Sequence, residues 1–184
     1  PRAIELVASK GDSQWVVTGD GEPAYVEAMR ELESRFPEQV RYRPFSAQLE
    51  RLLTRYGDFA VNAAWFEPSG LNQFFAMKNG TIPIVSAVGG LVDSVKRGVN
   101  GFLFNIAPGT GEAAYDVEKS ARNVARAARA AIDFYSQEDR LRAMRIAGMT
   151  ESHSWERRVR EDFMPFFESM LRGGPADCRE DLLP

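Results

Sequence analysis

The fold is decided by one stretch of sequence, Trp65-Phe66-Glu67-Pro68-Ser69-Gly70-Leu71-Asn72-Gln73-Phe74-Phe75-Ala76-Met77-Lys78-Asn79-Gly80. The apolar run before it, residues 58–64, indicates a buried strand. After it the apolar residues follow a helical spacing; they are Leu71, Phe74, Phe75 and Met77. A proline and a glycine stand between the two patterns, so we expect a sharp turn from the carboxyl end of a strand into a helix.

Such a junction suits a ligand that carries both phosphate and hydroxyl groups. The first backbone N–H groups of a helix have no partner inside the helix and can donate to a phosphate. The carboxylate of Glu67 would lie at the rim of the same pocket, where it can accept hydrogen bonds from hydroxyls but would repel a phosphate. The two features together predict a nucleotide-sugar site, although the spacing alone also fits an ordinary strand-to-helix connection.

The rest of the chain alternates strand and helix patterns, which predicts a parallel sheet covered by helices on both faces. Further strands are expected at residues 14–19, 40–45, 81–86 and 101–105, with a helix at residues 1–8 that no strand precedes and mainly helices from residue 116 onward. Pro83 should lie at the end of its strand or in an edge strand. Pro165 should kink or end the last helix. Ligands on such sheets bind beyond the carboxyl ends of the strands, where the 65–80 stretch falls.

Composition indicates a single ordinary globular domain. The chain has 184 residues, 44% of them hydrophobic, and a formal net charge of -3, so nucleic acid is not expected as a partner. No run approaches membrane-spanning length and the first residues do not form a signal peptide. The single cysteine, Cys178, cannot form an internal disulfide, which favours the cytoplasm or an organelle stroma such as that of plastids. Residues 173–184 lack apolar periodicity and are expected to form a flexible tail after a domain at 1–172.

Four motifs in order resemble the carboxyl-terminal domain of bacterial glycogen synthases and plant starch synthases. They are Phe66-Glu67-Pro68-Ser69-Gly70-Leu71-Asn72-Gln73, Gly80-Thr81-Ile82-Pro83-Ile84-Val85, Gly89-Gly90-Leu91-Val92-Asp93-Ser94-Val95 and Gly101-Phe102-Leu103-Phe104. Several motifs in a fixed order are more specific than one glycine-rich loop. The resemblance implies the GT-B architecture, in which two Rossmann-like domains face a cleft. This chain would be the carboxyl-terminal half, a parallel sheet with helices on both faces, incomplete at its amino end.

The same resemblance implies roles for individual residues in donor binding. Glu67 matches the glutamate that holds the hydroxyls of the donor sugar, and it is the candidate catalytic residue. The other candidates bind the donor: the backbone amides of Gly70 and Leu71 along the diphosphate and sugar, Ser69 in the place of the family's usual cysteine, Asn72 near the distal phosphate, Phe45 beside the nucleobase, and Gly89 and Gly90 in the backbone beside the cleft. For Phe45 a place in the core, and for the glycine pair an ordinary tight turn, are equally compatible with the sequence.

The implied reaction is transfer of glucose from ADP-glucose or UDP-glucose to an α-1,4-glucan, with retention at the anomeric carbon and without a metal or cofactor. The family also uses an Arg and a Lys in a segment before the first helix, and a Lys-x-Gly-Gly loop and a His from an amino-terminal Rossmann-like domain. These segments do not occur in the 184 residues. The resemblance therefore implies a donor-binding half that is inactive alone.

Three other interpretations stay open. The chain could belong to another GT-B glycosyltransferase, or it could be a non-catalytic subunit that binds a sugar nucleotide. An NAD-type dehydrogenase fits the alternation of strands and helices but not the loop Gly19-Asp20-Gly21-Glu22-Pro23, which lacks the third glycine of the dinucleotide-binding motif.

His153, the single histidine, is expected at the surface, so catalysis or metal binding based on histidine is not expected.

Overall fold

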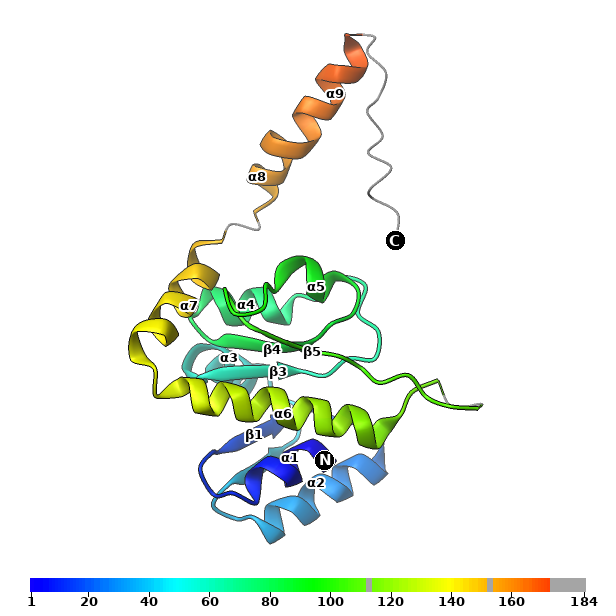
Figure 1. The fold of residues 1–184 in the computed structure, drawn as a ribbon, viewed down its shortest axis with the longest axis vertical. Coiled ribbons are helices and arrows are strands. Elements are labelled where there is room, and N and C mark those ends of the chain that lie inside the picture. The colour runs from blue at the N-terminus through cyan, green and yellow to red at the C-terminus, as the bar shows by residue number, and fades with distance from the viewer. Residues whose placement is uncertain (112–113, 152–153, 173–184) are drawn as a thin grey trace. The chain divides into compact units, whose positions relative to one another are not determined.

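The computed structural model describes residues 1–111, 114–151 and 154–172 of the chain (Figure 1). The chain divides into two compact units, residues 1–150 and 151–184. The first unit contains α1 (Arg2–Ala8), β1 (Trp15–Thr18), α2 (Pro23–Arg35), β2 (Val40–Arg43), α3 (Ala47–Tyr56), β3 (Phe59–Asn62), α4 (Asn72–Lys78), β4 (Ile82–Ser86), α5 (Gly90–Ser94), β5 (Phe102–Phe104), α6 (Val117–Tyr135) and α7 (Glu138–Thr150). This order confirms the predicted alternation.

Every strand of the described residues pairs in parallel, as predicted, and the strands form two sheets. Strands β1 and β2 make one sheet, and β3, β4 and β5 make the other in that order. Strand β4 lies in the centre of the second sheet and every residue of it is buried. Its Ile84 pairs with Val61 of β3 on one side and with Phe102 of β5 on the other. The carboxyl ends of these three strands therefore share one edge of the sheet.

Helix α6 holds the first unit together. Its Val124 and Ala131 pack against Ile84 and Phe104 of the three-stranded sheet. Its Ala125 and Ala128 pack against Val7 of α1, so α6 contacts α1 as well as β4 and β5 (Figure 1). Side chains buried in this way contribute about 1.5–3 kcal/mol each when they are as large as valine or leucine. The alanines let the two helices approach closely.

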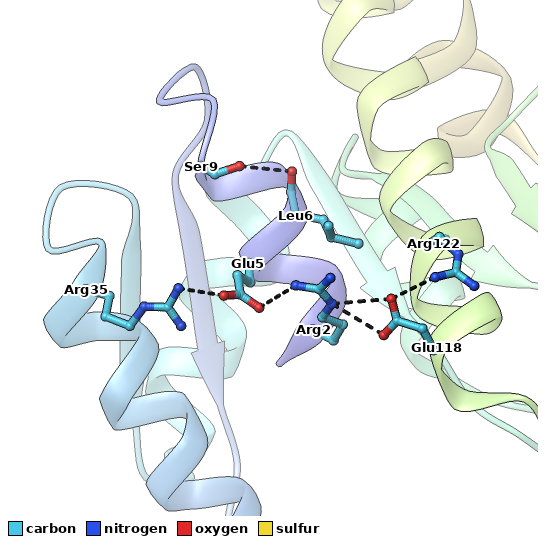
Figure 2. A network of polar contacts seen from close by, with 7 residues as sticks. All are labelled: Arg2, Glu5, Leu6, Ser9, Arg35, Glu118 and Arg122. Atoms are coloured by element: carbon cyan, nitrogen blue, oxygen red, sulfur yellow. Dashed lines mark hydrogen bonds and ion pairs between the residues drawn. The ribbon is translucent and has the colours of Figure 1, made fainter.

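Ion pairs also join α1 to its two neighbouring helices (Figure 2). Glu5 lies 2.6 Å from the guanidinium of Arg35 on α2 and 2.8 Å from that of Arg2. Arg2 in turn lies 3.3 Å from Glu118 on α6, and Glu118 lies 2.8 Å from Arg122. Hydrogen bonds from Arg2 and Arg35 lower the pKa of the Glu5 carboxyl below its usual value.

Strands β1 and β3 each leave one edge open among the described residues. The N–H of Trp15 donates to the carbonyl of Gln39, next to β2. Successive residues of a strand point in opposite directions, so the N–H and C=O of Val16 point away from β2, to the open edge of β1. The N–H of Ile82 in β4 donates to the carbonyl of Asp58, so Val61 likewise presents its backbone away from β4. The side chains of Val16 and Val61 remain 43% and 39% exposed. The two open edges are thus apolar as well as unpaired.

A helix and a cavity adjoin these edges. Helix α3 has apolar residues at Leu49, Leu52 and Leu53, yet none of its residues is fully buried. It contacts β1 and α4. A cavity of about 340 Å³ runs along β3 and is lined by residues 60–64 together with Asn72, Gln73, Pro83 and Val85. The apolar face of α3 is therefore only partly covered, less than is usual for an amphipathic helix.

The prediction that Pro83 could lie in an edge strand was wrong, because β4 is the central strand of its sheet; Pro83 is the second residue of β4, next to its start. The pairing between β4 and β5 begins at Ile84 with Phe102, one residue after the proline. No hydrogen bond of the β4–β5 ladder therefore needs the N–H that proline lacks. Gly101 packs against the proline, since a Cβ on Gly101 would lie 2.9 Å from Cγ of Pro83.

The second unit is helical in its described part. It comprises α8 (Trp155–Arg158), the π-helical turn η1 (Val159–Phe163) and α9 (Met164–Leu171). The helix does not end at Pro165, contrary to one of the two predicted outcomes, and continues to Leu171. A wider π turn directly ahead of a proline accommodates its missing N–H.

Among the described residues no helix is both long and apolar enough to cross a membrane. His153, Cys178 and the predicted tail at 173–184 lie outside the described residues.

Candidate functional site

The turn after β3 carries Glu67, as the sequence predicts. The chain leaves β3 at Asn62 and enters α4 at Asn72, and Glu67 lies half-buried between them. Gly70 has a φ of 72°, a conformation that residues with a Cβ rarely adopt. A Cβ there would also lie 2.7 Å from Oε1 of Gln73 and 3.2 Å from Cγ of Glu67. Glycine at position 70 thus lets the turn close against both side chains.

The loop after β4 lies directly against this turn. The N–H of Gly90 donates a 3.0 Å hydrogen bond to the carbonyl of Glu67. Gly89 has a φ of 44°, and a Cβ on it would lie 2.0 Å from the same carbonyl oxygen. A Cβ on Gly90 would lie 2.7 Å from Cα of Ser69. The two glycines are therefore required by a close backbone approach between two loops, not only by a tight turn.

Leu71 and Asn72 stand at the start of α4 with their side chains exposed. Leu71 is the N-cap residue, and no side chain of the described residues caps the helix there. The apolar pattern nevertheless misplaces the buried face of α4. Leu71 and Phe75 are exposed, whereas the residues buried in this helix are Gln73, Ala76 and Met77.

Phe45 lies in the connection between β2 and α3, beyond the carboxyl end of β2. Its side chain is 55% exposed, so it is not the core residue that the sequence left open. Its N–H donates to Oδ1 of Asp20 at 3.1 Å. Among the described residues no hydrogen bond or ring contact links Phe45 to the Glu67 turn. The structure therefore brings together Glu67, Ser69, Gly70, Gly89 and Gly90 but leaves Phe45 on a separate loop.

Sequence reasoning gave no role to two features beside the turn. The first is a stacked pair formed by Trp65 and Tyr115, whose ring centroids are 4.6 Å apart with planes inclined by 26°. Tyr115 comes from the connection between β5 and α6, so no local pattern could have indicated the contact. The second is the buried carboxamide of Gln73. A polar residue in a helical pattern is normally expected on the exposed face, so the pattern did not indicate its burial.

The described residues contain no group of three or more His, Cys, Asp or Glu side chains that could hold a metal ion. A second cavity, of about 410 Å³, lies beyond the carboxyl ends of β4 and β5. It is lined by Ala87, Val88, Asn105, Ile106, Ala107, Pro108, Lys119 and Asn123. Both cavities thus border the loops that follow the three-stranded sheet.

Comparison with known proteins gives a family match over most of the chain. Residues 2–130 match the family described as glycosyl transferases group 1. A similar protein is the glycogen synthase of Pseudomonas syringae pv. syringae (strain B728a), which is 32% identical over 169 residues. That alignment covers 91% of this chain but 32% of the relative, so the chain spans about a third of the curated relatives that it matches.

Two solved structures illustrate the similarity of fold. The catalytic domain of starch synthase IV from Arabidopsis thaliana, bound to ADP and acarbose, has a TM-score of 0.63 and 24% identity; the match covers 86% of this chain and 33% of that one. The Anabaena protein Alr3699/HepE in complex with UDP-glucose has a TM-score of 0.61 and 18% identity, covering 91% and 43% of the two chains. These matches confirm the predicted fold class, a Rossmann-like half of a GT-B protein.

Proposed function

Since this chain belongs to the glycosyl transferases of group 1, we propose that its α/β unit binds the nucleotide-sugar donor of a retaining glucosyltransferase of the glycogen or starch synthase type. The observation that carries the proposal is the hydrogen bond between the N–H of Gly90 and the carbonyl of Glu67. It joins the two loops beyond the carboxyl ends of β3 and β4, which is where ligands bind on parallel sheets.

The donor is ADP-glucose or UDP-glucose. The starch synthase IV structure contains ADP and the HepE structure contains UDP-glucose, and both share the fold of this chain. The glycogen synthase of Pseudomonas syringae, 32% identical, supports a glucosyl donor. The acceptor is the non-reducing end of an α-1,4-glucan.

Each candidate residue has a distinct task in this proposal. The Glu67 carboxylate accepts hydrogen bonds from the sugar hydroxyls and orients the ring, and it does not attack the anomeric carbon. The backbone amides of Gly70 and Leu71 lie along the sugar and the diphosphate, with Ser69 beside them and the side chain of Asn72 near the distal phosphate. Donors that are already in place stabilise the negative charge that develops on the leaving diphosphate. Exposed Phe45 stacks on the nucleobase with its ring.

The donor half acts within a longer protein that also supplies a facing amino-terminal Rossmann-like domain. The chain spans about a third of its curated relatives, which is consistent with a part of such a protein. The open edges of β1 and β3, together with the partly covered face of α3, support a further strand between the two sheets. The domain extends over residues 1–172 with a tail at 173–184, and the chain alone transfers no glucose.

A binding experiment on the 184-residue chain tests the proposal. Isothermal titration with ADP-glucose, UDP-glucose and NAD should show weak binding of a nucleotide sugar and none of NAD. Incubation with radiolabelled donor and glycogen should show no incorporation. Binding of NAD as tight as that of the nucleotide sugars, or no binding of either nucleotide sugar, would contradict the proposed donor site. Incorporation into glycogen would contradict the claim that the chain is inactive alone.

A panel of other nucleotide sugars separates the proposal from its nearest alternative. Tighter binding of a donor that does not carry glucose would assign the chain to another GT-B glycosyltransferase. That alternative shares the fold and the Glu67 turn, so only the identity of the preferred sugar distinguishes the two.

A further inference from the structure

The side chain of Gln73 connects the two loops of the proposed donor site. Gln73 is 2% exposed, although it is polar and lies in the first turn of α4. Its Nε2 lies 3.1 Å from the carbonyl of Ser69, 3.2 Å from that of Gly70 and 3.2 Å from Oγ of Ser94. A carboxamide has two N–H bonds, so two of these three acceptors share one hydrogen.

Ser94 extends the connection to the second loop. Its Oγ donates to the carbonyl of Gly90 at 3.0 Å. Gly90 is the residue whose N–H donates to Glu67. The chain of hydrogen bonds therefore runs from the turn after β3, through Gln73 and Ser94, to Gly90 and back to the same turn. Buried polar networks of this kind fix a single backbone arrangement when their members are paired.

The position of Gln73 Oε1 shows how closely the carboxamide lies to Glu67. Oε1 is buried and has no hydrogen-bond partner among the described residues. A Cβ on Gly70 would lie 2.7 Å from this atom and 3.2 Å from Cγ of Glu67, so both side chains converge on one point beside Gly70. A buried acceptor without a donor is unfavourable. The carboxamide is therefore held in place by what its Nε2 contacts, and it lies directly beneath the turn.

We infer that Gln73 is the positioning residue of the donor site: its carboxamide holds the Glu67 turn against the Gly89-Gly90 loop without touching the donor. The inference rests on the proposed function in one respect, namely that Glu67 binds the sugar. Loss of the Nε2 hydrogen bonds would let the turn relax. The contacts between Glu67 and the sugar would then weaken more than the contacts between the protein and the nucleotide.

The experiment compares two variants. Gln73→Met keeps the volume but removes all hydrogen bonds of the carboxamide, whereas Ser94→Ala removes the Gln73–Ser94 and Ser94–Gly90 bonds and leaves those from Gln73 to Ser69 and Gly70. Gln48→Met, at an exposed glutamine of α3, is the matched control. Titration gives the Kd of ADP-glucose or UDP-glucose, whichever the unmodified chain binds more tightly, and of the corresponding nucleoside diphosphate. Hydrogen exchange measured by NMR gives the protection of the Gly90 amide, with the buried Ile84 amide as a reference.

For Gln73→Met we expect the Kd of the nucleotide sugar to rise about tenfold, while that of the diphosphate changes less than about threefold. The Gly90 amide should exchange about tenfold faster and the Ile84 amide at its former rate. Ser94→Ala should shift both quantities in the same direction by about threefold, and it decides the question if Gln73→Met does not fold. Gln48→Met should change neither.

Equal weakening of sugar nucleotide and diphosphate, or a lower Tm with an unchanged ratio of the two Kd values, would show a merely structural residue and overturn the inference. Failure of the unmodified chain to bind any nucleotide sugar would contradict the proposed function instead. The Gly90 amide then decides alone: unchanged exchange in Gln73→Met overturns the positioning role, and faster exchange supports it.

Discussion

The N–H of Gly90 donates to the carbonyl oxygen of Glu67 at 3.0 Å, across two loops that are separated by more than twenty residues of sequence. This single contact defines the candidate site, because it brings a carboxylate turn and a glycine pair to one edge of the β3–β4–β5 sheet. The side chain of Glu67 is left half-buried beside it and available for a ligand.

Glu67→Ala should abolish recognition of the sugar but not of the nucleotide. Hydrogen bonds to a charged acceptor contribute about 1.5–3 kcal/mol, so the Kd of ADP-glucose or UDP-glucose should rise at least about tenfold. The Kd of ADP or UDP should change less than about twofold, because the diphosphate meets backbone amides. The Kd of the nucleotide sugar for Glu67→Gln should lie between those of the unmodified chain and Glu67→Ala, since a carboxamide oxygen still accepts a hydrogen bond. Equal loss for sugar nucleotide and diphosphate would contradict a role in sugar binding.

Gly89→Ala should destabilise the protein strongly. The new Cβ would lie 2.0 Å from the Glu67 carbonyl oxygen, and the φ of 44° is unfavourable for alanine. Separation of the two loops adds the loss of the hydrogen bond from Gly90 to Glu67, so we expect at least about 3 kcal/mol by urea denaturation.

Gly98→Ala is the control for the backbone term alone. Gly98 also has a positive φ, 75°, but a Cβ there would meet nothing within 4 Å. It should cost about 1–2 kcal/mol. A cost for Gly89→Ala no greater than that of Gly98→Ala would show that the loops can separate freely.

Glu5→Gln should change stability only above the acid range. Hydrogen bonds from Arg2 and Arg35 lower the pKa of Glu5 in the folded state, so its ionised form stabilises the fold above the unfolded pKa. That contribution is lost as the pH falls through the lower, folded pKa. The difference between the unmodified chain and Glu5→Gln should be at most about 1 kcal/mol at pH 7, because the pairs are accessible to solvent.

The same difference should shrink as the pH falls below the unfolded pKa of glutamate, and it should vanish once the pH is below the lowered pKa of the folded state, where both carboxyls are protonated. It should also shrink at pH 7 in about 1 M salt. Urea denaturation between pH 3 and 7 measures both effects. A difference that stays constant over this pH range would show that the network in Figure 2 does not involve an ionised Glu5.

Local sequence patterns predicted the strands of this fold well, because β2 alternates apolar and charged residues and the other strands are short, mainly apolar runs bounded by turn residues. The division into two sheets could not be predicted, since strand pairing depends on residues far apart in the chain. Pro83 shows the same limit. Whether a strand tolerates proline depends on where its neighbour begins to pair, and here β5 starts one residue later.

The candidate site was predicted in part. The backbone positions Glu67, Gly70, Gly89 and Gly90 do lie together, because their motifs follow adjacent parallel strands. The Trp65–Tyr115 stack and the buried Gln73 were not predicted. A glutamine in a helix pattern indicates an exposed residue, and only the three-dimensional approach of two loops gives its carboxamide partners.

Val61 and Ile84 test the open edge of β3, because they are direct partners in the register of β3 and β4. Val61→Thr should change the free energy of unfolding of this chain by less than about 0.5 kcal/mol, since its side chain is 39% exposed at the edge. Ile84→Thr should cost about 2–4 kcal/mol, because a hydroxyl replaces the ethyl group of a side chain that is buried. Val99→Thr, at an exposed valine, is the control for Val61→Thr, because it makes the same valine-to-threonine change at the surface.

In a longer polypeptide whose additional strand pairs with β3, the Val61 amide should become protected from hydrogen exchange and Val61→Thr should cost about 1–2 kcal/mol. A cost of that size already in the 184-residue chain would show that the edge is covered, for instance by a second copy, which sedimentation of the chain would detect.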